Sequence, residues 1–135
     1  MADLLLTSLS GASARQAVVE ESTASAWLYM TGPEGEEPVV HCFLYDTGGE
    51  PGEDEPPPLD PEFASGYRVA LPVTEDDVEI IWALDGHAVA VRIHGEYVAF
   101  IGPEDLRGYS RSVAIDCDWA HPFDAELFNR LFDME

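Results

Sequence analysis

The chain has 135 residues, 46% of them hydrophobic, which is enough for one domain to bury a core without disulfides or metals. It carries 27 acidic residues against six basic ones, all of them arginine, and its formal net charge is -21. The absence of lysine excludes Schiff-base chemistry and a P-loop phosphate lysine, while the charge disfavours nucleic acid and anionic lipid and favours basic partners, metal cations or simple solubility.

The first part of the chain is predicted to form short strands. Residues 4–19 indicate one or two strands broken at Ser10-Gly11, and a helix over 14–21 is an alternative that the pattern leaves open. The aromatic run 26–31 ends at a turn sequence, 32–35, and 39–45 is predicted to be its antiparallel partner in a hairpin.

Residues 46–62 have a different composition. They contain seven acidic residues, five prolines, three glycines and no basic residue. Such a segment buries too little apolar surface to offset the entropy that ordering costs. We expect a long, exposed and mobile loop inside a single domain, 1–135, because too little chain precedes it to fold alone.

The second half has the clearest strand pattern. Residues 67–73 are predicted to form a strand with Pro72 near its end or at a sheet edge. The runs 78–84 and 88–94 flank Asp85-Gly86, a pair that favours a tight hairpin turn. Residues 97–101 are predicted to complete a three-stranded meander, and 111–116 to add one more strand.

The end of the chain is predicted to be helical over 123–133. Pro122 is a suitable opening residue, and Asp124 and Glu126 in the first turn complement the helix dipole. Apolar residues at three- and four-residue spacing predict one face that packs on a sheet: Phe123, Leu127, Phe128, Leu131 and Phe132. The predicted fold class is α+β, mostly β: an antiparallel curved sheet or small sandwich with one C-terminal amphipathic helix packed on it.

The sequence favours a cytoplasmic protein. Residues 1–6 lack the positive charge and the longer apolar run of a secretory signal, and no apolar run approaches the length of a membrane span. Cys42 and Cys117 are far apart in the sequence and fit reduced thiols better than a disulfide framework.

Several motifs of the second half resemble a small bacterial domain family of unknown function. They are the hairpin 79–86 with its continuation 89–95, then 108–111, Trp119 and the terminal apolar helix. In the first half, only 42–46 is similar. The resemblance implies a β-rich fold and carries no activity, cofactor or site residue with it.

One cluster has residue types that bind metals. Residues 116–121 bring a carboxylate, a thiol and an imidazole together, and Cys117 and His121 are candidate zinc ligands. No second Cys or His pair stands at a recognised spacing to complete four ligands. The alternative is that Cys117 is a small core residue and His121 a residue at the start of the helix, so that no cofactor is expected.

Catalytic arrangements are weaker still. His41 and Cys42 are adjacent on a predicted strand and therefore point to opposite faces, although Cys42 could meet a distant His87, His94 or His121. The acidic pairs in 75–77 and 104–105 lie in turn-like sequence, where solvated carboxylates are common. We therefore predict that the protein is not an enzyme.

The acidic loop and the acidic turn before it are the best candidate for a binding surface. If both lie at the same end of the sheet, their carboxylates form one negative surface that attracts a basic partner. The alternative is a solvated insertion. The candidate partner-binding residues are Glu34, Glu36, Glu37, Glu50, Glu53, Asp54, Glu55, Asp60 and Glu62.

These features together suggest a non-catalytic acidic binding protein. The specific hypothesis is an immunity protein, an antidote that neutralises a basic bacterial toxin such as a nuclease effector encoded next to it, because nuclease sites are electropositive. The alternatives are a nucleic-acid mimic that inhibits a host protein, or a small enzyme or metal-binding module that uses Cys117 and His121. None of these readings involves direct contact with nucleic acid or a membrane.

Overall fold

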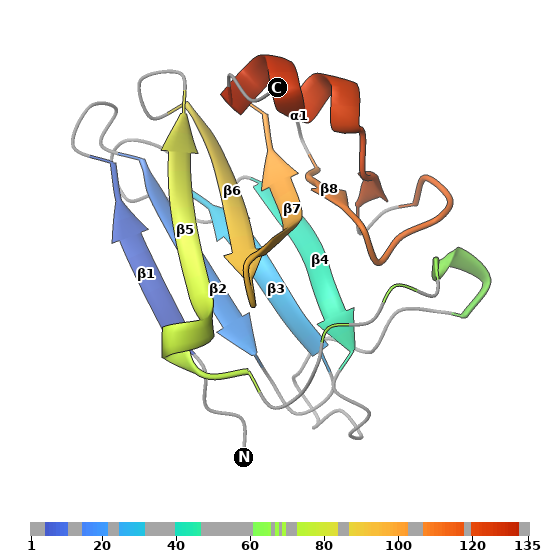
Figure 1. Cartoon of the computed structure of the whole chain (residues 1–135), viewed down its shortest axis with the longest axis horizontal. Coiled ribbons are helices and arrows are strands. Elements are labelled where there is room, and N and C mark those ends of the chain that lie inside the picture. The colour runs from blue at the N-terminus through green and yellow to red at the C-terminus, as the bar shows by residue number, and fades with distance from the viewer. Residues whose placement is uncertain are drawn as a thin grey trace.

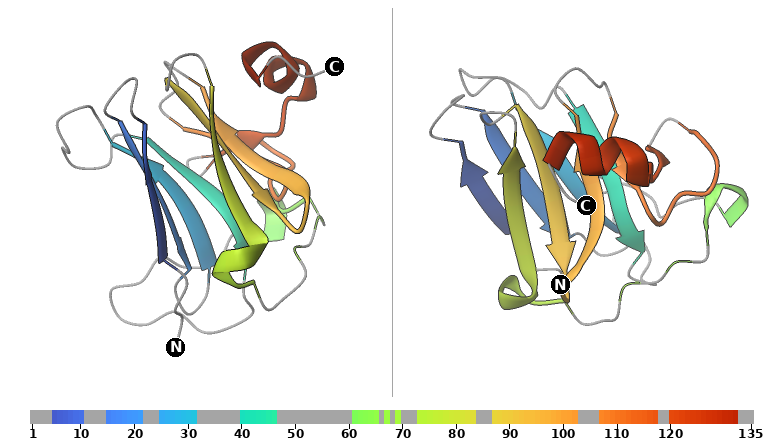
Figure 2. Two further views of the ribbon diagram at one scale, coloured as in Figure 1. Left: turned by 60° about the vertical axis from the view of Figure 1, so that its left-hand side comes forward. Right: turned by 45° about the horizontal axis from the view of Figure 1, so that its top comes forward.

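Two β-sheets face each other in the computed structural model, and a short helix covers the outer face of the second sheet (Figures 1 and 2). The structure describes residues 5–10, 15–21, 25–31, 40–46, 61–65, 67, 69, 73–83, 87–102, 107–117 and 120–132. The mostly-β prediction is confirmed, and of its two forms the structure adopts the small sandwich.

The first sheet is an antiparallel meander whose strands follow the sequence order. It contains β1 (Leu5–Leu9), β2 (Gln16–Glu21), β3 (Ser25–Met30) and β4 (Val40–Asp46). The helix considered over 14–21 is therefore not formed. In β2 the fully buried Ala17 and Val19 alternate with more exposed residues, which is the period of a strand with one face in the core.

The second sheet contains β5 (Val78–Ala83), β6 (Ala88–Ile93), β7 (Glu96–Ile101), β8 (Tyr109–Ser110) and β9 (His121–Pro122). The predicted meander of β5, β6 and β7 is confirmed, and β9 joins the edge as a parallel partner of β8. The turn from β6 to β7 needs two residues with positive φ, which His94 (52°) and Gly95 (82°) supply.

Two predicted segments are wrong in type or position. In 67–73 the described Tyr67, Val69 and Val73 lie outside any strand, and they pack against the core through their side chains. In 111–116 the chain turns at residues 111–112, Val113 makes one isolated bridge, and the paired residues are those of β8 just before it. Alternating apolar residues predicted strands in these two segments. Such a pattern reports that side chains pack on a core, and it does not report whether the backbone pairs with another strand.

The boundaries of the acidic loop and of the helix also change. Asp46 ends β4, and Pro61–Phe63 form the 3-10 helix η1, so the predicted loop 46–62 is too long at both ends; residues 47–60 lie outside the described part of the chain. A second 3-10 helix, η2 (Glu75–Asp77), leads into β5. Pro122 does not open the terminal helix, because it belongs to β9.

The two sheets enclose an aliphatic core, called the inter-sheet core below. Leu28 and Leu44 from the first sheet and Val89, Val91 and Ile101 from the second are fully buried in it. Each of these residues alternates along its strand with a residue on the other face, so both sheets direct one row of side chains inward.

The outer face of the second sheet carries a second cluster, called the aromatic layer below. The helix α1 (Ala125–Phe132) begins after Asp124, whose side-chain Oδ1 accepts a hydrogen bond from the Leu127 amide (3.0 Å). Its apolar face packs on the sheet as predicted, with the ring centroids of Phe128 and Phe100 5.4 Å apart. The aromatic layer consists of Ala90, Tyr97, Phe100, Tyr109, Phe123, Leu127, Phe128, Leu131 and Phe132.

In the part of the chain that the structure describes, α1 has eight residues, and no helix has the length and hydropathy needed to cross a membrane.

Candidate functional site

Of the nine predicted partner-binding carboxylates, the structure describes Glu62, which is exposed in η1. The other eight lie outside the described residues and stay predictions: Glu34, Glu36, Glu37, Glu50, Glu53, Asp54, Glu55 and Asp60. The described strands nevertheless fix where the chain enters and leaves each acidic segment.

The two acidic segments are anchored at opposite ends of β4. The segment with Glu34, Glu36 and Glu37 connects Thr31 to Val40, whereas residues 47–60 follow Asp46. These anchor points are separated by the length of a seven-residue strand, roughly 20 Å at about 3.4 Å per residue. The condition that both segments leave the same end of the sheet is therefore not met, because consecutive connections of a meander alternate between its ends.

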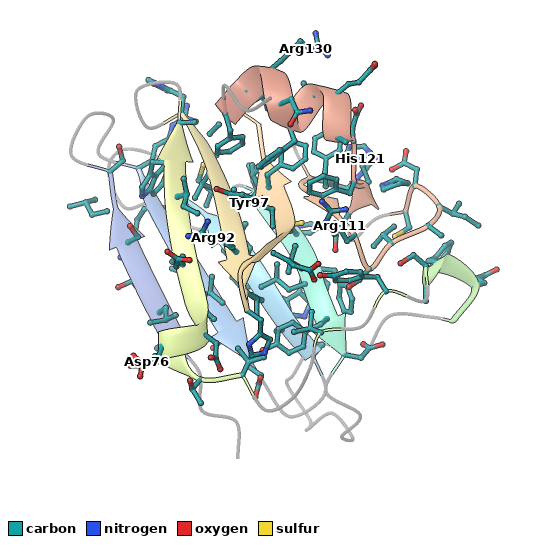
Figure 3. The ribbon with its side chains drawn as sticks, in the orientation of Figure 1. Asp76, Arg92, Tyr97, Arg111, His121 and Arg130 are labelled. Carbon is teal, nitrogen blue, oxygen red and sulfur yellow. The ribbon has the colours of Figure 1, made fainter. Side chains whose placement is uncertain are left out.

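The end of the sandwich that contains Asp46 is rich in described carboxylates. Antiparallel pairing puts Glu20, Glu21 and Asp46 at one end of the first sheet, and puts η2 and Glu96 at one end of the second. Figure 1 shows the end of β4 and η2 at the same end of the sandwich. In Figure 3, Asp76 marks this end, and Arg130 and His121 lie toward the other. The set, called the acidic end below, is Glu20, Glu21, Asp46, Glu75, Asp76, Asp77, Glu79 and Glu96.

The outer carboxylates of the acidic end face solvent. Glu20, Glu75, Asp76, Glu79 and Glu96 are exposed. Like charges gathered within one surface produce a stronger local field than the same charges dispersed over the molecule. The arrangement therefore provides a negative surface that segment 47–60 adjoins at Asp46.

Other carboxylates of the acidic end are held by hydrogen bonds. The Thr74 amide (2.9 Å) and hydroxyl (3.1 Å) both donate to Asp77 Oδ2, and the backbone hydrogen bond lowers the pKa of Asp77. Tyr67 Oη donates to Glu96 Oε1 (3.0 Å). The Thr74 bonds favour the ionised form of Asp77, and the bonds to both carboxylates fix their positions, so part of the negative charge is preorganised.

Glu79 and Glu21 each contact a side chain of another strand, Arg92 and Tyr45 respectively. Arg92 lies opposite Glu79 in the β5–β6 ladder and its Nη2 is 2.6 Å from Glu79 Oε1. Tyr45 Oη donates to Glu21 Oε1 (2.6 Å), and burial, followed by this hydrogen bond, raises the pKa of the Tyr45 phenol. Among the described residues of this end, Arg92 is the arginine that offsets part of the acidic charge.

Sequence reasoning placed the acidic surface in the loops and missed the acidic end. The signal was present in the topology: in a meander, every second connection returns to the same end of the sheet. The predicted strands put residues 20–24 and 46–62 at alternate connections, but the predicted strand at 67–73, which is not formed, would have placed 94–96 at the opposite end.

The predicted metal cluster is partly assembled. His121 Nδ1 lies 2.6 Å from Asp116 Oδ1, and Arg107 Nη2 lies 3.2 Å from the same oxygen. Cys117 Sγ instead donates to the Ala120 carbonyl (3.6 Å), and Asp118 is outside the described part of the chain. Within the described ranges, no three His, Cys, Asp or Glu side chains are placed to hold one metal ion.

Cys42 is buried in the inter-sheet core beside Cys117. Its thiol donates to the carbonyls of Phe43 (3.6 Å) and Tyr109 (3.5 Å) rather than to a histidine. Burial, followed by the charge of Cys117, raises the pKa of the Cys42 thiol. A thiol in these surroundings is a poor source of the thiolate that nucleophilic catalysis requires.

His121 is not at the start of the helix, as the alternative reading assumed, because it belongs to β9 and lies against Tyr109, with ring centroids 4.8 Å apart. Cys117 is half-buried and packs against the inter-sheet core, as that reading expected. Trp27, an aromatic residue that could have served a docking surface, is buried.

Comparisons with protein-family models, curated proteins and solved structures found no match. The resemblance to a small bacterial family therefore stays a prediction.

Proposed function

We propose that the protein is a non-catalytic cytoplasmic binding protein for a basic protein partner, and that it contacts this partner through the acidic end. In its specific form, the protein is an immunity protein that neutralises a basic toxin, such as a nuclease effector encoded next to it. The observation that carries the proposal is the gathering of eight described carboxylates at one end of the sandwich in a chain of net charge -21.

The physical argument is electrostatic complementarity. A nuclease site is electropositive because it holds phosphates, and a negative surface can occlude it without performing any chemistry. Preorganised carboxylates such as Asp77 lose little entropy when the partner binds. Residues 50–60 carry five further acidic side chains, and the chain enters this segment from Asp46 at the acidic end.

The test uses the purified product of the neighbouring open reading frame and two variants with the same change in net charge. Glu75→Gln/Asp76→Asn neutralises two exposed carboxylates of the acidic end, and Asp116→Asn/Glu126→Gln neutralises two elsewhere. We expect the first variant to slow association by about tenfold at low salt and the second to leave it nearly unchanged. The slower association of the first variant, compared with the wild type, should become less marked as salt approaches molar concentration.

A partner that binds equally well to both variants, at a rate independent of salt, would contradict the proposal. A neighbouring product that is neither toxic nor bound would contradict its immunity-protein form. Binding to a host nucleic-acid-processing protein with the same variant pattern would support a nucleic-acid mimic instead.

The segment after β4 is tested separately. Replacing residues 50–60 by a short Gly-Ser connection should slow association while leaving the melting temperature nearly unchanged. The replacement stops before Pro61 because Phe63 packs on the core and its carbonyl accepts a hydrogen bond from the Ala114 amide (2.7 Å). Glu53→Gln/Asp54→Asn/Glu55→Gln should reproduce part of the loss.

The second candidate function rests on the Asp116–His121 contact, which orients the imidazole as in many catalytic and metal sites. Under the proposed function, Cys117→Ser and His121→Ala leave partner binding unchanged. Stoichiometric zinc in purified protein that is lost in either variant would favour the metal-binding module.

A further inference from the structure

Among the described strands, β1 is an edge strand of the first sheet with β2 as its single neighbour, and its outward side chains are exposed. Leu5 and Leu9 are 56% and 67% exposed, and with Thr7 they form the outward row of the strand. Leu6 points inward and packs against the inter-sheet core. On its other side β1 pairs with β2 from Leu5 to Leu9 in continuous register.

Natural sheet edges are usually protected against pairing by a charge, a proline or a bulge. Residues Leu5–Leu9 contain no charge and no proline, and their pairing with β2 shows no register shift. The edge of the second sheet on the same side, β5, differs because it carries the outward ion pair of Glu79 with Arg92. Of these two neighbouring edges, β1 is the one that the sequence leaves open.

The edge strand is also held in place. Trp82 Nε1 of β5 donates to Ser8 Oγ (2.9 Å), so the edge strands of the two sheets are joined by a side-chain hydrogen bond. Figure 1 shows β1 and β5 along the same side of the sandwich. A strand fixed in this way loses little further entropy when another strand pairs with it.

We propose that two copies of the chain pair antiparallel through β1, on a two-fold axis at Thr7, and so join their first sheets into one continuous sheet. Residues Leu5–Leu9 are nearly symmetric about Thr7, with leucine at both ends. Antiparallel pairing about that residue places Leu5 opposite Leu9 of the second copy, so the exposed leucines cover one another.

The charge distribution selects this occupant and this orientation. A basic peptide would find no carboxylate on Leu5–Leu9, whereas a second copy offers the same apolar row. Leu5 lies beside Glu20 at the acidic end and Leu9 beside Gln16 at the other end. Antiparallel pairing therefore directs the two acidic ends away from each other, while parallel pairing would bring them together.

The dimer should be weak and strengthened by salt. A five-residue strand pair belongs to the small end of protein interfaces. The remaining repulsion between two chains of charge -21 is screened as ionic strength rises. Sedimentation of the full chain should show monomer at low concentration and an approach to twice that mass between about 10 µM and 1 mM, at lower concentrations in 1 M salt.

Two double variants and one single variant test the register in which β1 pairs with β1 of the second copy. Leu5→Glu/Leu9→Glu should weaken the dimer at least tenfold, because every cross-strand contact of these residues becomes repulsive. Leu5→Glu/Leu9→Lys should restore it, because antiparallel pairing sets each Glu opposite a Lys. Ile115→Glu, at another exposed apolar residue (55%), is the matched control and should leave the dimer unchanged. All replaced residues are exposed, and the small loss of melting temperature from placing Leu5→Glu opposite Glu20 is common to both Leu5 variants, so it does not affect their comparison.

The proposal is overturned by a monomer under all these conditions, or by a dimer that ignores Leu5→Glu/Leu9→Glu. A dimer that Leu5→Glu/Leu9→Lys weakens as much as the double glutamate variant would overturn the antiparallel register. These outcomes do not depend on the basic partner, so they are separate from the test of the proposed function.

Discussion

The two faces of the second sheet are packed in different ways. The inner face meets another sheet through small aliphatic side chains such as Val89 and Val91, which are fully buried. The outer face meets one helix of eight residues through rings, with Phe100 at the centre. A helix this short is unstable alone in water, so its ordering depends on the aromatic contacts. The inter-sheet core has many equivalent contacts, while the aromatic layer depends on a few large ones.

The largest expected effect comes from removing the central ring. Phe100→Ala should lower the free energy of unfolding by about 3–5 kcal/mol, since the fully buried ring contacts Phe123, Phe128 and Phe132. The neighbouring Ile101 points to the inter-sheet core and is also fully buried, so Ile101→Ala is a matched control at about 2–5 kcal/mol. Urea titration measures both.

The contrast between the two faces of the second sheet would be wrong if the helix contributed little to the free energy of unfolding. A loss below about 1 kcal/mol for Phe100→Ala would show that the aromatic layer adds little to stability. Amide hydrogen exchange separates the two faces further: Phe100→Ala should speed exchange in 128–132 more than in β6, and Ile101→Ala should not.

Gly108 lies where the two cores meet. A Cβ at this position would be 2.5 Å from Cys42 Cβ, 2.7 Å from Cys42 Sγ and 2.8 Å from the Phe100 carbonyl oxygen. Gly108→Ala should therefore cost about 3 kcal/mol, the upper end of the usual range for overpacking, because backbone cannot move aside. Gly95→Ala is the control: nothing lies within 4 Å, so only its positive φ opposes the methyl group, at about 1 kcal/mol. Equal losses in thermal or urea unfolding would contradict the steric explanation.

The thiol in the inter-sheet core makes stability depend on alkaline pH. Burial raises the pKa of Cys42 above that of the unfolded chain, so the folded state retains a proton that the unfolded state loses. This contribution is complete below the unfolded thiol pKa, about 8.5, and falls as pH rises above it, by about 1.4 kcal/mol per pH unit. Urea titrations between pH 7 and 10.5 should show the slope, and Cys42→Ala should reduce it. An unchanged slope in Cys42→Ala would assign it to another group, such as Tyr45, whose pKa is also raised.

The smallest effect concerns the helix start alone. Asp124→Ala removes the acceptor for the Leu127 amide and should cost about 1 kcal/mol. Asp124→Asn keeps an acceptor oxygen and should cost less. The loss should appear as faster hydrogen exchange in the helix, with the inter-sheet core unaffected. A loss above about 3 kcal/mol would mean that the cap also supports the sheet.

Most of the fold could be predicted from local pattern. The hairpin of β5 and β6 follows from alternating β-branched runs around Asp85-Gly86, and the apolar face of α1 from its spacing. The segment 67–73 was predicted wrongly because its described residues Tyr67, Val69 and Val73 pack on the core, as strand residues do, although they lie outside any strand. The parallel pair β8–β9 is too short to have a pattern of its own and depends on contacts between distant residues.

The site was predicted less well than the fold. Net charge and loop composition indicate an acidic surface as the feature to examine, but they do not show which carboxylates share an end. That depends on the direction of every strand: Glu20 and Glu96 are 76 positions apart and reach the same end only because their strands run as they do. The prediction for the cysteines is confirmed in that both thiols are free, with Cys42 buried and Cys117 half-buried, although the sequence did not show that the two lie near each other.

Each sheet is made from one continuous stretch of chain, and this has a consequence for assembly. A cut within 47–60 would leave every described strand pair intact, with β1–β4 in one fragment and β5–β9 in the other. The two fragments would meet through the inter-sheet core, the isolated bridge between His41 and Arg107, and the hydrogen bond from Ser112 Oγ to the Leu44 carbonyl (2.6 Å). The molecule is thus suited to fragment complementation. Each of two separately made halves contains all the described strands of its own sheet, and the two halves would associate through their aliphatic faces.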